Sequence, residues 1–269
     1  MPNSQQNQQP ESQPPVSGQL VLRIPTSRPL VTYVLLGSIA LVFLAQMVTN
    51  QLAYPRLTQP LLDFGAIDFQ RILIDHEYYR LFTAMFLHVS TIHVFFNGLA
   101  LWSFGQAVER FFGHARFAVI YLLGGLSGSM ASFIFTHGRS VGASAAIFAI
   151  FGAEMIFLYL NRQLLGQAAL RELRSLIILA ALNLAVGLFT EVVPGGVIID
   201  NWAHIGGFFG GVVLAWFVAP QLQLQPDAAA PSGFRIVDGN PPAKTWTTPL
   251  IFAVALAAVL VYAIVNMRV

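Results

Sequence analysis

Long apolar runs recur along this chain and are separated by short segments that carry most of its charge. Runs of about 18 or more apolar residues are long enough to cross a bilayer as helices. We interpret seven such runs as spans, at residues 30–49, 91–108, 117–136, 143–160, 174–190, 201–219 and 249–266. The pattern predicts an all-α polytopic membrane bundle, with a core of six helices followed by one further transmembrane helix.

The segments outside these runs predict the domain organisation. Residues 1–29 are Gln- and Pro-rich and predict a disordered tail. The six-helix core follows and covers residues 30–219. Residues 50–90 are apolar in patches yet punctuated by charges, which favours an element lying in the membrane interface. Residues 220–248 are polar and Pro-rich, and predict a linker to a seventh transmembrane helix within 249–269.

Composition and charge agree with a membrane protein. Of 269 residues, 56% are hydrophobic and 10% are charged, whereas soluble domains carry roughly 25% charged residues. A net charge of +2 is too small to indicate a nucleic-acid partner, and the absence of cysteine excludes disulfides and thiolate sites. With the N-terminus inside, inner segments hold nine Lys and Arg residues and outer segments hold five. This bias predicts a cytoplasmic tail and a cytoplasmic linker.

Four polar side chains within the predicted spans require an explanation, because such groups are costly in lipid and usually face the bundle interior. They are His93 and Asn97 in the second span, Ser144 in the fourth and His204 in the sixth. At a rise of about 1.5 Å per residue, Ser144, His204 and His93 lie about 24–25 Å from the inner ends of their helices. Three helices therefore place polar groups at one level, toward the outer side of a hydrocarbon core about 30 Å thick.

Small residues indicate how two of these groups meet. Gly207 and Gly211 give the sixth span a face that lets a neighbouring backbone approach closely. If that face packs on the fourth span, His204 comes within hydrogen-bond reach of Ser144 and can activate it as a nucleophile. Glu154 lies nearly three turns deeper than Ser144, so we expect a Ser–His dyad rather than a three-residue triad.

The remaining polar groups fit the same chemistry. His93 and Asn97 lie one turn apart on one helix face. Their N–H groups, with the backbone N–H of Ser144, are candidates to stabilise an oxyanion. Phe148 shares the face of Ser144 and is expected to support the imidazole of His204 from below.

Taken alone, each of these residues has a simpler interpretation. A serine in an apolar helix most often bonds to its own backbone, and a lone histidine most often only packs. His88 and His93 suggest a metal pair, but a five-residue spacing puts them on different helix faces. No carboxylate or thiol joins them, so we expect no metal.

The motifs together resemble a known family. The stretches "YYRLFTAMFLHVSTIHVFFNGLALWSFGQAVERFFG", "GASAAIFAIFGA" and "AHIGGFFGG" resemble the rhomboid intramembrane serine proteases, in the family's order and on the expected spans. The likeness covers residues 30–219, and the extra helix resembles the six-plus-one arrangement of many members. The fold this implies is a six-helix rhomboid-like core plus one C-terminal transmembrane helix.

The resemblance implies an activity and the residues that perform it. Ser144 would be the nucleophile and His204 the general base, with His93 and Asn97 as oxyanion-binding side chains. The family cleaves transmembrane segments of other proteins without a metal or cofactor. The expected partners are therefore transmembrane protein substrates and the lipid bilayer, not nucleic acid, and the expected location is the bacterial cytoplasmic membrane. The oligomeric state stays open.

Further positions are implied to be structural. Arg80 and Glu109 match residues that fix the first loop and a helix end, and His88 matches a structural motif histidine. Residues 190–200, "TEVVPGGVIID", correspond to a loop that caps the active site, and their Pro and Gly residues suit a movable segment.

Three departures from the family pattern keep alternatives open. Ala145 replaces the usual Gly after the serine, Phe148 replaces a Tyr, and Tyr79 replaces a Trp. The methyl group of Ala145 would lie beside the oxyanion site. It leaves open a catalytically inactive rhomboid-like protein that binds transmembrane helices. A small transporter with a polar path is a second alternative, but it predicts discontinuous helices or paired repeats, and the sequence shows neither.

Overall fold

The computed structural model describes residues 24–53, 59–192, 199–230 and 232–267. The predicted disordered tail lies mostly outside these residues, as does most of the predicted capping loop. Five of the predicted spans form helices that are long and apolar enough to cross a membrane. They are α1 (Leu30–Ala53), α7 (His114–Phe135), α9 (Arg162–Val192), α10 (Asn201–Val218) and α12 (Thr247–Met267).

The second and fourth predicted spans are also helical, but the second is interrupted and the fourth is short. The second consists of α5 (Thr91–Ala100), the π-helix η2 (Leu101–Gly105) and α6 (Gln106–Phe112). Together with the short helical segment Arg80–Phe86, it is long and apolar enough to cross a membrane. The two parts are bent by 90° from each other. The fourth is α8 (Ser144–Leu160), an apolar helix of 17 residues. The expected all-α polytopic bundle is confirmed.

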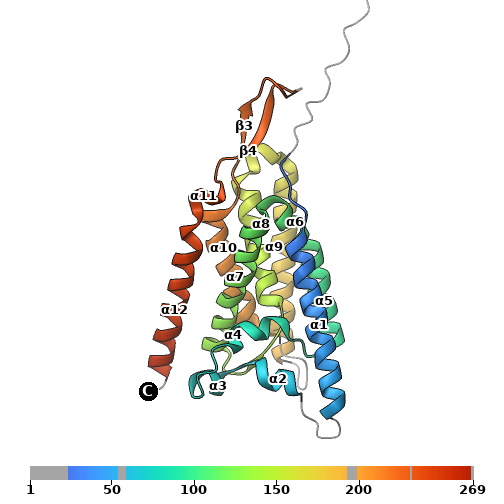
Figure 1. Ribbon diagram of the computed structural model, residues 1–269, viewed down its shortest axis with the longest axis vertical. Coiled ribbons are helices and arrows are strands. Elements are labelled where there is room, and N and C mark those ends of the chain that lie inside the picture. Colours follow the sequence, from blue (N-terminus) through green and yellow to red (C-terminus); the bar gives the residue numbers. More distant parts are fainter. Residues whose placement is uncertain (1–23, 54–58, 193–198, 231, 268–269) are drawn as a thin grey trace, which may run out of the picture.

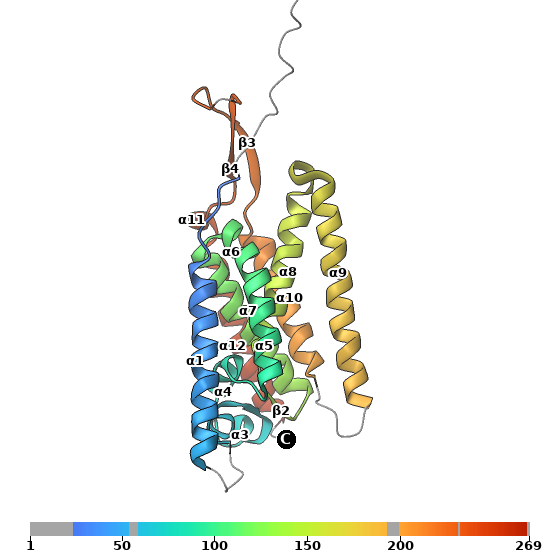
Figure 2. The ribbon, with the colours of Figure 1, turned by 90° about the vertical axis from the view of Figure 1, so that its right-hand side faces the viewer.

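Short elements gather at the two ends of the bundle (Figure 1). One end holds α2 (Pro60–Gly65), α3 (Phe69–Leu73), α4 (Arg80–Thr83) and η1 (Ala84–Phe86), and β1 (Ile67–Asp68), which pairs antiparallel with β2 (Arg139–Ser140). We call residues 59–90 the platform. The opposite end holds an antiparallel hairpin of β3 (Leu222–Pro226) and β4 (Phe234–Asp238), followed by α11 (Pro242–Thr245). The start of α1 lies at the hairpin end, and the end of α12 lies beside the platform (Figures 1 and 2).

The segment predicted as a linker, residues 220–248, is more ordered than its composition indicated. Its strands pair from Leu222 with Asp238 to Pro226 with Phe234. Arg116 of α7 holds the hairpin at its foot, because its guanidinium lies 2.9 Å from the Asp238 carboxylate and also donates to the carbonyl of Asn240.

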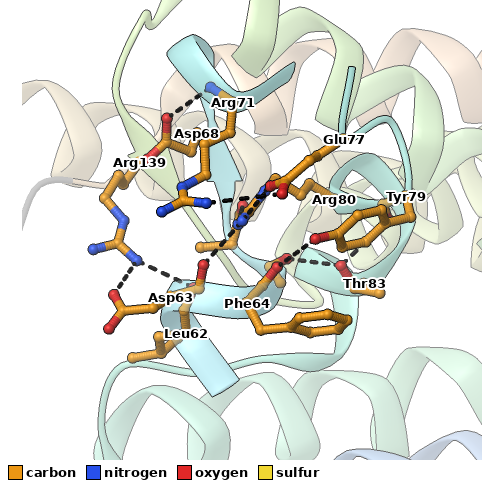
Figure 3. Close-up of polar contacts among 12 residues, drawn as sticks. Leu62, Asp63, Phe64, Asp68, Arg71, Glu77, Tyr79, Arg80, Thr83 and Arg139 are labelled. Atoms are coloured by element: carbon orange, nitrogen blue, oxygen red, sulfur yellow. Dashed lines mark hydrogen bonds and ion pairs between the residues drawn. The ribbon is translucent and has the colours of Figure 1, made fainter. Parts of the chain in front are cut away.

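A buried arginine organises the platform. Arg80 is only 1% exposed, and its guanidinium donates to the carbonyls of Ala66 and Asp63, each at 3.0 Å, and to the Glu77 carboxylate at 2.5 Å (Figure 3). Each of the three guanidinium nitrogens therefore has an acceptor, as a buried polar group requires. The role implied for Arg80, fixing the first loop, agrees with these bonds.

A buried carboxylate caps α1 from the neighbouring span. Glu109 of α6 accepts the backbone N–H groups of Val31 and Thr32, at 2.8 and 2.7 Å, and the Thr32 hydroxyl at 2.6 Å. These N–H groups belong to the first turn of α1 and have no intrahelical acceptor. The negative charge also complements the positive end of the helix.

Close approach of backbones defines the centre of the bundle. A Cβ at Gly207 would overlap the backbone of Ala145, and one at Gly211 would overlap the backbone of Ala149. The predicted small-residue face of α10 therefore packs directly on α8. On its other side, α10 packs on α7, where Ser127 donates to the Gly206 carbonyl at 3.0 Å.

We predict that Gly207→Ala destabilises the protein by about 1–3 kcal/mol, because its methyl group meets backbone that cannot rotate away. Gly37→Ala on α1 is the matched control, since a Cβ there has nothing within 4 Å. Unfolding measured in detergent for both variants tests this. Equal stability of the two variants would contradict the close α8–α10 contact.

Candidate active site

Ser144 is the first residue of α8 and is half-buried. The loop that delivers it is tied to the platform, because the Gly142 N–H donates to the Ala84 carbonyl at 2.9 Å. The first intrahelical bond of α8 runs from the Ile147 N–H to the Ala143 carbonyl. The backbone N–H of Ser144 is therefore not used by the helix, and its hydroxyl lies at the positive end of the α8 dipole.

His93 and Ser144 border the same small space at Gly142. Gly142 has a φ of +130°, a conformation that favours glycine. A Cβ on it would lie 2.8 Å from both Cε1 and Nε2 of His93 and 3.7 Å from the Ser144 hydroxyl oxygen. The structure thus brings together a hydroxyl from α8 and an imidazole from α5, as the shared depth of these residues predicted.

His204 stands next to the first turns of α8. It is 7% exposed, and its ring stacks on Phe148 with centroids 4.3 Å apart and planes inclined by 11°. The predicted support of the imidazole by Phe148 is therefore present. Phe148 lies one turn beyond Ser144 and on the same face of α8. The stack therefore places His204 beside the face of α8 that carries Ser144.

The hydroxyl and the imidazole are not bonded to each other in this conformation. Within the described residues, no hydrogen bond joins Ser144 to His204, and the buried Nδ1 of His204 has no partner. Contacts of this kind are often long in the absence of substrate. His204 and Ser144 lie on helices whose backbones touch at Gly207 and Ala145, and one nitrogen of the imidazole has no partner among the described residues.

Asn97 lies one turn beyond His93 on α5 and faces the protein interior. It is 6% exposed, and its amide donates to the His93 carbonyl at 3.0 Å. Its Oδ1 is buried without a partner among the described residues. It forms no hydrogen bond within the described residues to the loop carrying Ser144, whereas His93 lies against Gly142 of that loop.

His88, between η1 and α5, contacts His93 and is held by α1 through bonds that the sequence did not indicate. Its ring meets the ring of His93 edge-on, with centroids 4.9 Å apart. Its backbone is held by the Gln46 side chain, which donates to the His88 carbonyl at 3.0 Å and accepts its N–H at 3.1 Å. The available signal was a glutamine inside an otherwise apolar span.

Ala145 directs its methyl group toward α7. A Cβ added at Gly128 would lie 2.6 Å from the Ala145 Cβ, so the two side-chain positions point at each other. The space that Gly128 leaves empty is the space that Ala145 fills. The methyl group is therefore accommodated between helices, away from the space shared by His93 and Ser144.

An apolar cavity of about 260 Å³ opens beside His204, between α8, α9 and α10. Phe148 also lines it, and His204 is its one polar lining residue among those described. The cavity gives an apolar group access to the imidazole from the α9 side. In the described part of the chain, no three His, Asp or Glu side chains are grouped as a metal site would require.

Comparison with known proteins identifies the family. The Rhomboid domain matches residues 75–221. Over 174 residues the chain is 40% identical to Rhomboid protease GluP of Bacillus subtilis, a match covering 64% of this chain and 31% of that protein. It is 34% identical over 199 residues to RHOMBOID-like protein 1 of Arabidopsis thaliana, covering 71% and 49%.

A third relative, RHOMBOID-like protein 6, mitochondrial, of Arabidopsis thaliana, is 37% identical over 160 residues, covering 59% of this chain and half of its own length. The chain thus spans about a third to a half of these curated relatives. The Rhomboid domain covers more than half of the chain and includes α5, α8 and α10, which carry the site. This chain is a multi-pass membrane protein that belongs to the rhomboid family.

Proposed function

We propose that this protein is an intramembrane serine protease that cleaves transmembrane segments of other membrane proteins. The observation that carries the proposal is the close α8–α10 contact. It sets the Phe148-stacked imidazole of His204 beside the helix start that presents Ser144. The catalytic unit in this proposal is the six-helix core, residues 30–219.

The reaction follows from the chemistry of these two groups. The Ser144 oxygen attacks the scissile carbonyl while His204 takes the hydroxyl proton. The imidazolium then protonates the leaving amine, which breaks the C–N bond and leaves an acyl group on Ser144. Water, deprotonated by His204, attacks this ester, and the departing Ser144 oxygen recovers a proton. Among the described residues no carboxylate is bonded to the imidazole, so packing on Phe148 must hold the ring.

Negative charge on the tetrahedral intermediate requires donors close to the serine. The backbone N–H of Ser144 at the start of α8 is one, and the His93 imidazole, which borders the same space, is a second. The amide of Asn97 is the third donor in this proposal. Its NH2 group has two N–H donors, of which one bonds to the His93 carbonyl, so the second is the donor to the oxyanion.

The charge distribution supports an orientation in a bacterial cytoplasmic membrane. The hairpin end of the bundle carries the larger share of Lys and Arg, including Arg110, Arg116 and Arg162. Placing that end in the cytoplasm satisfies the positive-inside rule. Ser144 then lies toward the outer leaflet, and the N-terminus is cytoplasmic.

The first test is labelling with a fluorophosphonate probe, which reacts with activated serines. We expect the wild type to be labelled, Ser144→Ala to be unlabelled and His204→Ala to react at least about 100-fold more slowly, since it lacks the base. Ser38→Ala is the matched control, because Ser38 only bonds to the Val34 carbonyl of its own helix. Cleavage of single-span substrates in detergent by the same variants completes the test. An unlabelled wild type, or a labelled Ser144→Ala, would overturn the proposal.

The rival function is a catalytically inactive helix-binding protein, and Ala145 discriminates between the two. Because its methyl group points at Gly128, we expect Ala145→Gly to label within about threefold of the wild type. Labelling that appears only in Ala145→Gly would instead support the rival.

Gly142 provides a test of the proposed oxyanion donors. Gly142→Ala pushes a methyl group against the His93 ring and strains a backbone at φ +130°. We predict that it lowers the labelling rate at least about tenfold. Gly233→Ala, at another positive φ but with nothing within 4 Å, should label at the wild-type rate. Equal rates for the two variants would remove His93 from the proposed site.

A further inference from the structure

A single carboxylate ties the start of α10 to the end of α7. Asp200 precedes α10, and its Oδ1 accepts the Ala203 N–H at 3.0 Å, which caps the helix. The same oxygen accepts the Thr136 hydroxyl at 2.9 Å, and Oδ2 accepts the Ser132 hydroxyl. Three donors from two helices therefore converge on one side chain.

The two hydroxyls that donate to Asp200 lie at the end of α7, on one face. Ser132 is 1% exposed, and Thr136 follows it by one turn, so both hydroxyls lie on the same face. On its other side, the start of α10 is held by Asn201, whose amide donates to the Leu184 carbonyl of α9 at 3.2 Å. The start of α10 is thus bonded to both α7 and α9.

The hydrogen bonds to Asp200 resist movements of α10 that the glycine contacts permit. Faces built from small residues allow backbones to approach closely, but they have no protruding side chains that resist sliding along the helix axis. Hydrogen bonds are directional and weaken steeply when misaligned. The bonds that α7 donates to Asp200, together with the bond from Ser127 to the Gly206 carbonyl, therefore define the height and rotation of α10, whereas the glycines define only its distance from its neighbours.

His204 is the residue that this attachment controls most directly. It lies one turn after Asp200, and its backbone N–H donates to the Asp200 carbonyl at 3.3 Å. The plane of its ring must stay over Phe148 for the imidazole to remain beside the first turn of α8. A displacement of about 1 Å at a reacting group is enough to cost about 100-fold in rate.

We propose that Asp200 is a positioning residue for the active site. With Ser132 and Thr136 it fixes the register of α10 on α7, and it thereby holds the imidazole of His204 in line with Ser144. Asp200 acts through the helix backbone rather than by touching the imidazole. The inference rests on the proposed function of Ser144 and His204.

The test compares the kinetics of fluorophosphonate labelling in three variants. Asp200→Ala removes both the cap and the attachment, whereas Ser132→Ala/Thr136→Ala removes only the attachment. We expect both to lower the maximal labelling rate about tenfold while the probe concentration giving half of that rate changes less than about twofold. Asp200→Asn keeps a capping oxygen and an amide that the hydroxyls can bond, so it should stay within about threefold of the wild type.

The control removes two hydroxyls of the same kind from elsewhere. Ser38→Ala/Thr49→Ala on α1 deletes groups that bond only within their own helix, and it should label at the wild-type rate. Wild-type rates in Asp200→Ala would overturn the proposal. Wild-type rates in Ser132→Ala/Thr136→Ala would overturn it as well, because Asp200 would then act only as a helix cap.

A second readout reports the register without any chemistry at Ser144. The chain has no cysteine, and Phe135 of α7 contacts Trp202 of α10 with ring centroids 4.7 Å apart. In a Phe135→Cys/Trp202→Cys background, we expect Asp200→Ala to slow disulfide formation at least about threefold, since the thiols lose their alignment. If the wild type is not labelled, the proposed function fails. The cross-linking rate then decides alone, and a rate unchanged by Asp200→Ala would overturn the register role.

Discussion

The direct contact between the backbones of α10 and α8 is the constraint on which the rest of this structure depends. Gly207 and Gly211 permit it, because any side chain at either position would overlap α8. The contact matters chemically because α8 begins with Ser144 and α10 carries His204 one turn before the first of these glycines. Larger residues would separate the helices and move the base away from the nucleophile.

Polar groups in this bundle fall into two kinds, and the difference follows the proposed chemistry. Arg80 and Glu109 are buried charges, and each has several hydrogen-bond partners that fix a loop or a helix end. By contrast, His204, Asn97 and His88 each bury at least one side-chain atom that has no partner among the described residues. Unsatisfied buried groups are costly and rare. Arg116, Tyr121, Glu154 and Asn201 also bury one such atom each, and the three groups near the site suit bonds that substrate and water complete.

Sequence reasoning predicted the helices and the helix contacts around the site better than it predicted the hairpin and the long-range hydrogen bonds. Apolar runs located the helices of the bundle, five of them long enough to cross a membrane, and small-residue spacing located the α8–α10 contact, because length and side-chain volume are local properties. The hairpin escaped notice because its prolines and glutamines indicate a linker, although "LQLQP" alternates with the period of a strand. Gln46 and Asp200 escaped notice because their partners lie 42 and 64–68 residues away in sequence. The expected bond between Ser144 and His204 depends on a difference in side-chain orientation that spacing alone does not determine.

The most direct measurement of the central claim is a crystal structure of the protein after reaction with the fluorophosphonate. The account predicts phosphorus bonded to the Ser144 oxygen and a phosphonyl oxygen within hydrogen-bond reach of the Ser144 N–H and the His93 imidazole. It also predicts a His204 nitrogen about 2.6–3.2 Å from the Ser144 oxygen. Phosphorus on another residue, or a His204 ring turned away from Ser144 in the adduct, would contradict it.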